Sequence, residues 1–166
     1  VMKPILHSGL VALILAGPTG PAANFPELAT FTGMCDAPAA TAIDGERFIV
    51  ADDEDNVLRV YSRAGGTPLV ERDLSEFIEA MGKKKPKEAD LEAAARIGSH
   101  IMWITSHGRN WKGKEKPERQ RLFATEVTVR GGKVQIEPKG KPYTDLLDVL
   151  INDSRLAKYH LADAAQ

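Results

Sequence analysis

The feature that most constrains the fold of this chain is an internal repeat with a spacing of about 50 residues. Residues 36–43 align without a gap with residues 90–97, and the register continues as far as Asn56, which falls on Asn110. A single insertion at about residues 111–120 then separates the two copies. Short β-type runs that recur at this spacing are typical of the blades of a β-propeller or of a related array.

Each copy of the repeat predicts four short strands, because runs rich in β-branched or large apolar residues are divided by Asp, Asn and Gly-Gly turns. A helix is the competing prediction for residues 87–96, since Glu, Ala and Leu favour one. The repeat argues against that helix, because Pro38 lies in the equivalent segment of the first copy. The strands are expected at residues 37–43, 47–51, 57–63 and 69–73, and again at 91–97, 100–105, 122–130 and 133–137.

These strands predict a mainly β fold, a β-propeller-like fragment of about two four-stranded blades. The blades would comprise about residues 31–74 and 88–138, within a repeat domain of residues 24–142. Two blades cannot close a ring, which takes at least about four. We therefore expect that the chain is a truncated piece of a propeller. The alternatives are a half-propeller that pairs with other copies and an open arrangement of two sheets.

Residues 143–166 are predicted to form a helical C-terminal segment. Apolar residues fall on one side of a helix over residues 144–151, with Thr144 as its N-cap. Asp153 or Ser154 would cap a second short helix that runs through Leu161. Between the two copies, residues 75–81 are expected to form one or two helical turns capped by Ser75.

The N-terminal residues 1–23 have the pattern of a secretory signal peptide. Lys3 is followed by an apolar stretch at residues 5–16 and by a Gly/Pro-rich exit at residues 17–23. The stretch is too short for a membrane span, which needs about 20 apolar residues. The sequence thus predicts a periplasmic or secreted protein with no membrane span after cleavage; a buried N-terminal helix and an uncleaved anchor are the alternatives. Cys35 would then be a lone thiol, and we expect it to be buried and inert.

The balance of charge excludes one class of partner. The chain has 22 basic and 23 acidic side chains, so its formal charge of -1 provides no general attraction to phosphate backbones, and no nucleic-acid partner is expected. A single cysteine makes no disulfide framework, and no Cys/His spacing is typical of a zinc site.

In a propeller, the loops before the innermost strands and after the second strands would lie on one face, where function usually resides. Clustered carboxylates repel one another unless a cation or solvent compensates them, and calcium prefers oxygen ligands of this kind. An acidic, solvated turn is the alternative interpretation. The candidate metal ligands, for calcium as the possible cofactor, are Asp52, Asp53, Asp55, Asp90 and Glu92.

The turn after the second strand of the second copy supplies the candidate catalytic residues. His107 could act as a general base near neutral pH, and Arg109 could bind a phosphate or a carboxylate. Ser106 is a poor nucleophile for His107, because adjacent side chains point apart in an extended segment. Further candidate ligand-binding residues are Asp36, Ser106, Asn110, Arg119 and Arg121. Alternatively, the two arginines pair with the acidic turn in a salt-bridge network; Trp103 and Trp111 are expected to be packing residues.

Several blocks of the sequence together resemble the domain-of-unknown-function 3616 family. The blocks are Thr32–Ala37, Phe48–Tyr61, Glu88–Ala94, Ser106–Asn110 and Arg119–Ala124. The resemblance covers about residues 31–161 and implies a bacterial, exported, β-propeller-like protein. Family members are about twice as long, which implies that this chain is truncated. The family has no established activity to transfer.

Two functions fit these observations, and the leading one is a module that binds an unknown small molecule or an envelope protein through its loop face. The alternative is a calcium-dependent hydrolase of phosphate or other esters, similar to phytase-like propellers, with the carboxylates as ligands and His107 and Arg109 orienting the substrate. A third possibility is that the fragment has no activity of its own.

Overall fold

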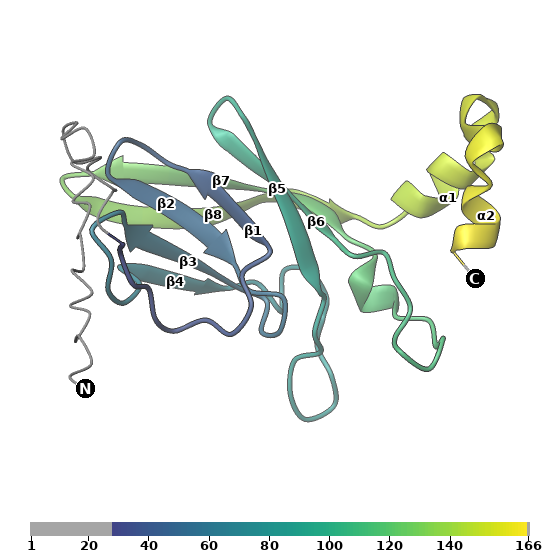
Figure 1. The fold of residues 1–166 in the computed structure, drawn as a ribbon, viewed down its shortest axis with the longest axis horizontal. Helices are drawn as coiled ribbons and strands as arrows, with labels where there is room; N and C mark the ends of the chain where they lie inside the picture. The colour runs from purple at the N-terminus through teal and green to yellow at the C-terminus, as the bar shows by residue number, and fades with distance from the viewer. Residues whose placement is uncertain (1–27, 166) are drawn as a thin grey trace, which may run out of the picture.

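Two antiparallel four-stranded sheets make up most of the structure, a computed structural model that describes residues 28–165 (Figure 1). Each sheet is a meander in which strands adjacent in sequence pair with one another. The first sheet comprises β1 (Ala39–Ala42), β2 (Arg47–Ala51), β3 (Val57–Ser62) and β4 (Val70–Asp73). The second comprises β5 (Leu91–Ile97), β6 (His100–Thr105), β7 (Leu122–Arg130) and β8 (Lys133–Tyr143). The mainly β class and the two four-stranded units are therefore confirmed.

The strands begin and end close to their predicted positions. The bounds of β2, β5, β6 and β7 coincide with the prediction, so the helix considered for residues 87–96 does not form. β1 is shorter than expected, because Pro38 has no N–H to contribute to the ladder with β2. β8 is longer: its pairing with β7 passes through a bulge near Gly140, at φ +67°, and resumes at Tyr143.

A single hydrophobic core lies between the two sheets. Ile49 and Val60 are paired across β2 and β3 and are fully buried in it. From the second sheet, Trp103 and its cross-strand neighbour Phe123 fill the same core. The indole N–H of Trp103 donates to Thr125 Oγ1 at 2.9 Å, so this large ring is buried without an unpaired polar atom. Trp103 is thus a packing residue, as predicted.

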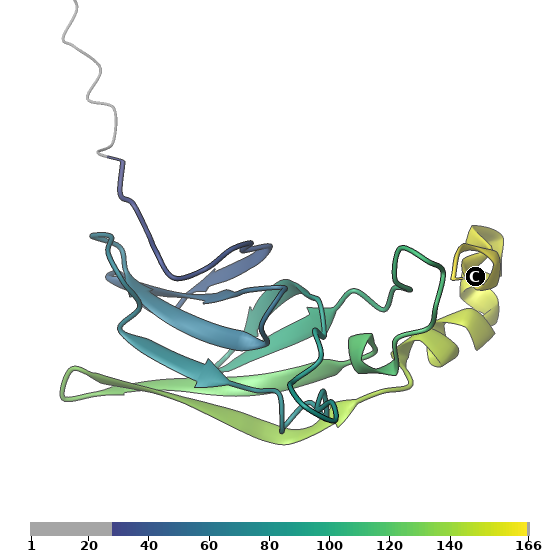
Figure 2. The ribbon, with the colours of Figure 1, turned by 90° about the horizontal axis from the view of Figure 1, so that it is seen from below.

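The two sheets approach most closely along their first strands, β1 and β5 (Figures 1 and 2). Arg96, on β5, reaches across and donates from Nη1 to the carbonyl oxygens of Ala42 and Ile43, at 3.0 and 2.6 Å. β4 approaches β8 on the other side of the core. Within the described residues, the two sheets form no closed ring.

Residues that precede β1 cover the outer face of the first sheet. Phe31 packs edge-on against Phe48 and Tyr61, with ring centroids 5.1 and 5.5 Å apart. The Tyr61 hydroxyl donates to the carbonyl oxygen of Thr32 at 2.9 Å, and Phe31 forms a parallel bridge with Gly66. This outer aromatic cluster fixes the path of the chain up to Cys35. Cys35 itself is exposed, so the expectation of a buried thiol is wrong.

The C-terminal segment is helical, as predicted, and projects from the end of the second sheet (Figure 1). It comprises α1 (Leu146–Asn152), a 3-10 helix η2 (Ser154–Tyr159) and α2 (Leu161–Ala164), none of which buries a residue completely. Asp153 caps η2 by accepting a bond from the Arg155 N–H at 2.9 Å. Thr144 is not the cap of α1, because Asp145 precedes the helix and its side chain makes no capping bond.

Residues 75–79 form consecutive turns rather than a helix, and Ser75 does not cap them, because its hydroxyl accepts a hydrogen bond from Asn56 instead. A further short 3-10 helix, η1 (Pro117–Arg119), lies in the insertion between β6 and β7.

Within residues 28–165, we find no helix of sufficient length and apolar character to cross a membrane. The predicted signal peptide, residues 1–23, lies outside the described residues.

Asn56 joins the two sheets through buried hydrogen bonds. It follows β2 with a left-handed backbone (φ +59°), and its side chain reaches the linker that leads into β5. Nδ2 donates to Ser75 Oγ at 3.1 Å and to the carbonyl oxygen of Lys87 at 2.7 Å. Oδ1 accepts from the N–H of Ala89 at 2.8 Å. These three bonds fasten the β2–β3 turn to the start of the second sheet.

Replacing Asn56 with Ala should lower the free energy of unfolding by about 3 to 5 kcal/mol, because buried partners are left unsatisfied and Ala disfavours a positive φ. Urea unfolding followed by circular dichroism measures this loss. Asn110→Ala is the matched control, because the repeat aligns the two positions but the Asn110 side chain accepts only from the N–H groups of Lys112 and Lys114 in its own loop. A loss no larger than that of the control would contradict the role given to Asn56.

Candidate functional site

Four loops gather along one edge of the two sheets, and we call this region the loop edge. They are residues 35–36 before β1, 52–56 after β2, 88–90 before β5 and 106–110 after β6. The N–H of Cys35 donates to Asp52 Oδ2 at 3.0 Å, and the N–H of Ser106 donates to the carbonyl oxygen of Asp90 at 2.8 Å. Together with the bonds of Asn56, these contacts connect loops that are distant in the sequence.

Asp53 is a partly buried carboxylate of the acidic turn after β2. Its Oδ1 is buried without a hydrogen-bond partner. Burial raises the pKa of Asp53 to about 6, and the negative charges of Asp36, Asp52 and Asp90 act in the same direction. Because Asp36 and Asp90 belong to different loops, their influence on Asp53 agrees with the predicted convergence of these segments.

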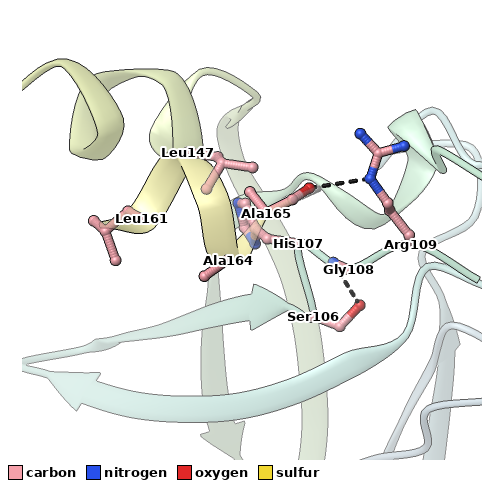
Figure 3. A pocket seen from close by; sticks show the side chains of 8 residues that line it. All are labelled: Ser106, His107, Gly108, Arg109, Leu147, Leu161, Ala164 and Ala165. Carbon is pink, nitrogen blue, oxygen red and sulfur yellow. Dashed lines mark hydrogen bonds between the residues drawn. The ribbon is translucent and has the colours of Figure 1, made fainter. Parts of the chain in front are cut away.

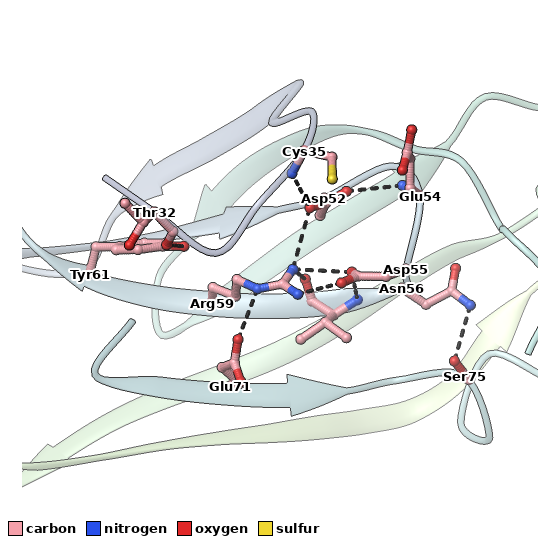
Figure 4. Close-up of polar contacts among 11 residues, drawn as sticks. Thr32, Cys35, Asp52, Glu54, Asp55, Asn56, Arg59, Tyr61, Glu71 and Ser75 are labelled. Carbon is pink, nitrogen blue, oxygen red and sulfur yellow. Dashed lines mark hydrogen bonds and ion pairs between the residues drawn. The ribbon is translucent and has the colours of Figure 1, made fainter. Parts of the chain in front are cut away.

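Arg59 compensates the charge of the acidic turn (Figure 4). This residue of β3 is only 8% exposed. Its guanidinium bonds to the carboxylate of Asp55, donates from Nε to Glu71 Oε1 at 3.0 Å, and has Nη1 3.6 Å from Asp52 Oδ2. The hydrogen bonds to Asp55 raise the pKa of Arg59 above its ordinary value, so it remains charged. Asp52 and Asp55, which were predicted to bind a metal, thus pair with an arginine of the chain.

Arg119 has the equivalent role beside the second sheet. Its Nη1 donates to Asp90 Oδ2 at 2.7 Å, and its Nη2 bonds to Glu88. Arg119 therefore pairs with the acidic residues before β5, and not with the acidic turn at residues 52–55 as the salt-bridge alternative predicted.

Arg121 is buried at 7% exposure and its guanidinium donates to main-chain carbonyls, among them those of Ile78 and Pro117 at 2.7 and 2.6 Å. Its donors hold the insertion against the linker, so they are not directed toward a ligand.

The five predicted calcium ligands do not form one coordination sphere. Asp52 and Asp55 pair with Arg59, and Asp90 pairs with Arg119. Glu92 is exposed at the bulge of β5. In the part of the chain that the structure describes, no group of three or more His, Cys, Asp or Glu side chains is arranged to hold a metal ion.

His107 lines a pocket of about 320 Å³ between the loop after β6 and the C-terminal helices (Figure 3). We call it the His107 pocket. The ring Nδ1 lies 2.8 Å from the carbonyl oxygen of Thr105, which can only accept, so Nδ1 carries a proton and, in the neutral ring, Nε2 is the acceptor. Nε2 is buried and has no hydrogen-bond partner among the described residues. The remaining walls are mainly apolar and come from Leu147, Leu161, Ala164 and Ala165.

The other predicted residues of this loop are occupied by local contacts. Arg109 donates from Nε to the carbonyl oxygen of Ala165 at 3.0 Å and from Nη2 to Glu115 Oε1 at 2.9 Å, so it ties the loop to α2. Ser106 Oγ accepts from the N–H of Gly108 and is not bonded to His107. Asn110 Oδ1 accepts main-chain bonds within the loop.

The exposed groups at the loop edge include two that the sequence placed in the interior. Trp111 is 89% exposed, with Lys112 above its ring, so its predicted packing role is wrong. The Cys35 thiol has a raised pKa because of the negative charges of Glu54 and Asp52, which keeps it protonated. Sequence reasoning also missed Arg59, although a lone charge within an apolar strand run is a usable signal for a buried ion pair.

Comparisons with protein-family models, with curated proteins and with solved structures find no match to this chain. The resemblance to the domain-of-unknown-function 3616 family therefore stays a prediction.

Replacing Arg59 with Gln should lower the free energy of unfolding by about 2 to 4 kcal/mol, because the buried carboxylate of Asp52 loses its counter-charge and the bonds of Arg59 to Asp55 and Glu71 are lost. The control is Arg47→Gln, which breaks a more exposed pair with Asp44 and should lower it by about 1 kcal/mol or less. Urea unfolding at neutral pH compares the two variants. Equal losses would show that the acidic turn does not depend on Arg59.

Asp53→Asn should stabilise the protein at pH 7.5 by about 1 kcal/mol, after allowance for solvent screening of this partly exposed group. The sign follows from the raised pKa of Asp53, because the folded wild-type protein holds this proton more tightly than the unfolded chain does. The stability of the wild-type protein therefore falls as the pH rises from about 4 to about 6. Thermal melts of both proteins from pH 4 to pH 8 test this, and the difference should vanish at the acidic end. Glu76→Gln, at an exposed position, is the control; a stabilisation that does not vary with pH would contradict the assignment.

Proposed function

We propose that this chain is a binding module that takes a ligand in the His107 pocket at its loop edge. The observation that carries the proposal is His107 in the wall of a pocket with mainly apolar lining, with its Nε2 buried and without a hydrogen-bond partner among the described residues. A buried acceptor without a partner destabilises the protein, and a ligand that donates a hydrogen bond to it removes that penalty. The expected ligand therefore has one hydrogen-bond donor and an apolar body that contacts Leu147 and Leu161.

The same proposal includes export and a propeller-type architecture. The resemblance of the sequence to exported propeller-like proteins supports both, and the approach of β1 to β5 along the core is consistent with neighbouring blades. An exported module of this kind would meet small molecules or envelope proteins, which are the partners that we propose.

Binding can be tested with a library of small aromatic and aliphatic amides and amines, observed in ¹H–¹⁵N correlation spectra of the protein. We expect shifts of the backbone signals of residues 106–109 and 161–165, and His107→Phe should weaken binding about tenfold, because the ring loses its acceptor. His100→Phe, which changes an exposed histidine, is the control and should bind as wild type does. A library without hits in these segments, or equal affinity of both variants, would refute the proposal.

A calcium-dependent hydrolase is the second proposal and has less support, since arginines already compensate the carboxylates that calcium would need. We expect the melting temperature to be the same in calcium and in chelator, to within about 1 °C, because an ion that does not bind the native state cannot stabilise it. Circular dichroism measures the melt, and a phosphate-ester assay with and without calcium accompanies it. A clear upward shift in calcium would return Asp52, Asp53 and Asp55 to the list of ligands.

A further inference from the structure

A second pocket of about 500 Å³ at the loop edge is lined by five lysines from two separate loops. We call it the lysine pocket. Its lysines are Lys83, Lys84, Lys85 and Lys87, from the turn before β5, and Lys116, from the insertion after β6. Two acidic residues, Glu54 and Glu88, also line it, and the charge of Glu88 is compensated by Arg119. The pocket therefore has a net positive charge although the whole chain has a formal charge of -1.

The turn that carries four of these lysines is held in one conformation. The N–H of Gly82 donates to the carbonyl oxygen of Lys85 at 3.0 Å, and the N–H of Lys87 donates to that of Ala80 at 2.7 Å. Met81 and Pro86 form an antiparallel bridge across the turn. A Cβ atom at Gly82 would lie 2.4 Å from the Lys85 oxygen, so this tight turn requires glycine. The lysines thus project from a hydrogen-bonded turn and not from an unstructured charged run.

A buried carboxylate positions the two lysines that connect the loops. Glu118 is only 4% exposed, and its two oxygens each lie 3.4 Å from a lysine Nζ, one from Lys87 and the other from Lys116. Burial alone would raise the pKa of Glu118, but its hydrogen bonds and the two lysines outweigh burial and lower that pKa. Glu118 therefore stays ionised and joins the turn before β5 to the insertion, which closes one wall of the pocket.

The remaining charge is available to a ligand. Lys83, Lys84 and Lys85 are exposed, and no carboxylate of residues 28–165 lies within ion-pair distance of them. These three residues line one pocket, so a multiply charged anion in it would be attracted by all three positive charges. A single carboxylate would neutralise only one of them. The volume is that of a site for a small molecule.

We propose that the lysine pocket binds a small polyanion that carries several phosphate groups. Lysines act toward phosphate as mobile point charges, and several of them around one cavity suit a ligand whose charges are distributed over adjacent phosphates. This ligand site is separate from the His107 pocket, and it does not depend on the function proposed above.

Inorganic tripolyphosphate is the probe, and isothermal titration of the full chain measures its affinity. The double variant Lys84→Glu/Lys85→Glu should weaken binding about tenfold or more, because two attractive charges become repulsive. Arg130→Glu/Lys133→Glu is the matched control: it makes the same change in net charge at exposed residues of the β7–β8 hairpin, at the far end of the sheet. The affinity of this control variant for tripolyphosphate should stay within about twofold of wild type. Salt screens the effect of charges that lie far from the pocket.

Additional probes distinguish a specific pocket from general attraction. Inorganic phosphate should bind at least about tenfold more weakly than tripolyphosphate, since it engages fewer lysines. Adenosine triphosphate tests whether the same phosphates are accepted with a nucleoside attached, and a short single-stranded DNA tests a nucleic-acid partner.

The proposal fails if tripolyphosphate does not bind at about 50 mM salt, at which electrostatic contacts are still strong. It fails equally if the two double variants lose the same affinity, or if the DNA binds more tightly than tripolyphosphate. Far-ultraviolet circular dichroism confirms that the variants fold. His107→Phe should bind tripolyphosphate as wild type does, so that failure at one pocket is distinguishable from failure at the other.

Discussion

The relative placement of the two sheets depends on the buried hydrogen bonds of Asn56. A hydrophobic core alone fixes no unique orientation of two sheets, because apolar contacts are not directional. The bonds from Asn56 to Lys87 and Ala89 are directional, and they attach the turn after β2 to the entry of β5. This attachment brings the turn at residues 52–56 to the segment at residues 87–89, and Asp90 directly follows that segment. The asparagine at the aligned position of the second copy, Asn110, makes no such connection.

Charge compensation is the second organising constraint, and it distinguishes the three charged regions of the loop edge. Arg59 pairs with Asp52 and Asp55, and Arg119 pairs with Asp90, so these ion pairs compensate part of the negative charge of the acidic loops. Asp53 is the exception, with a buried oxygen that no donor reaches. In the lysine pocket the balance is reversed, because Glu118 orders two lysines while three others have no partner carboxylate in the described part of the chain.

The His107 pocket and the lysine pocket differ in their chemistry, and both receive residues from the segment between β6 and β7. The His107 pocket offers one neutral acceptor within apolar walls, whereas the lysine pocket offers several positive charges in water. Arg109 lies in the loop after β6 and Lys116 in the insertion, so the segment between β6 and β7 contributes to both sites.

The sequence by itself determined the strands, because their signals are local. Alternating apolar residues and Gly or Asp turns predicted β2, β6 and β7 at their observed bounds, and the repeat rightly opposed a helix at β5. On the assumption of propeller geometry, it also predicted that the loops of Asp36, Asp53 and Asp90 lie on one face. Tertiary structure decided everything that depends on contacts between distant segments. Arg59 turned out to pair with the acidic turn, Trp111 to be exposed, and Lys116 to meet the lysines before β5. Such contacts are set by how two sheets pack, and no local pattern of residue types encodes that packing.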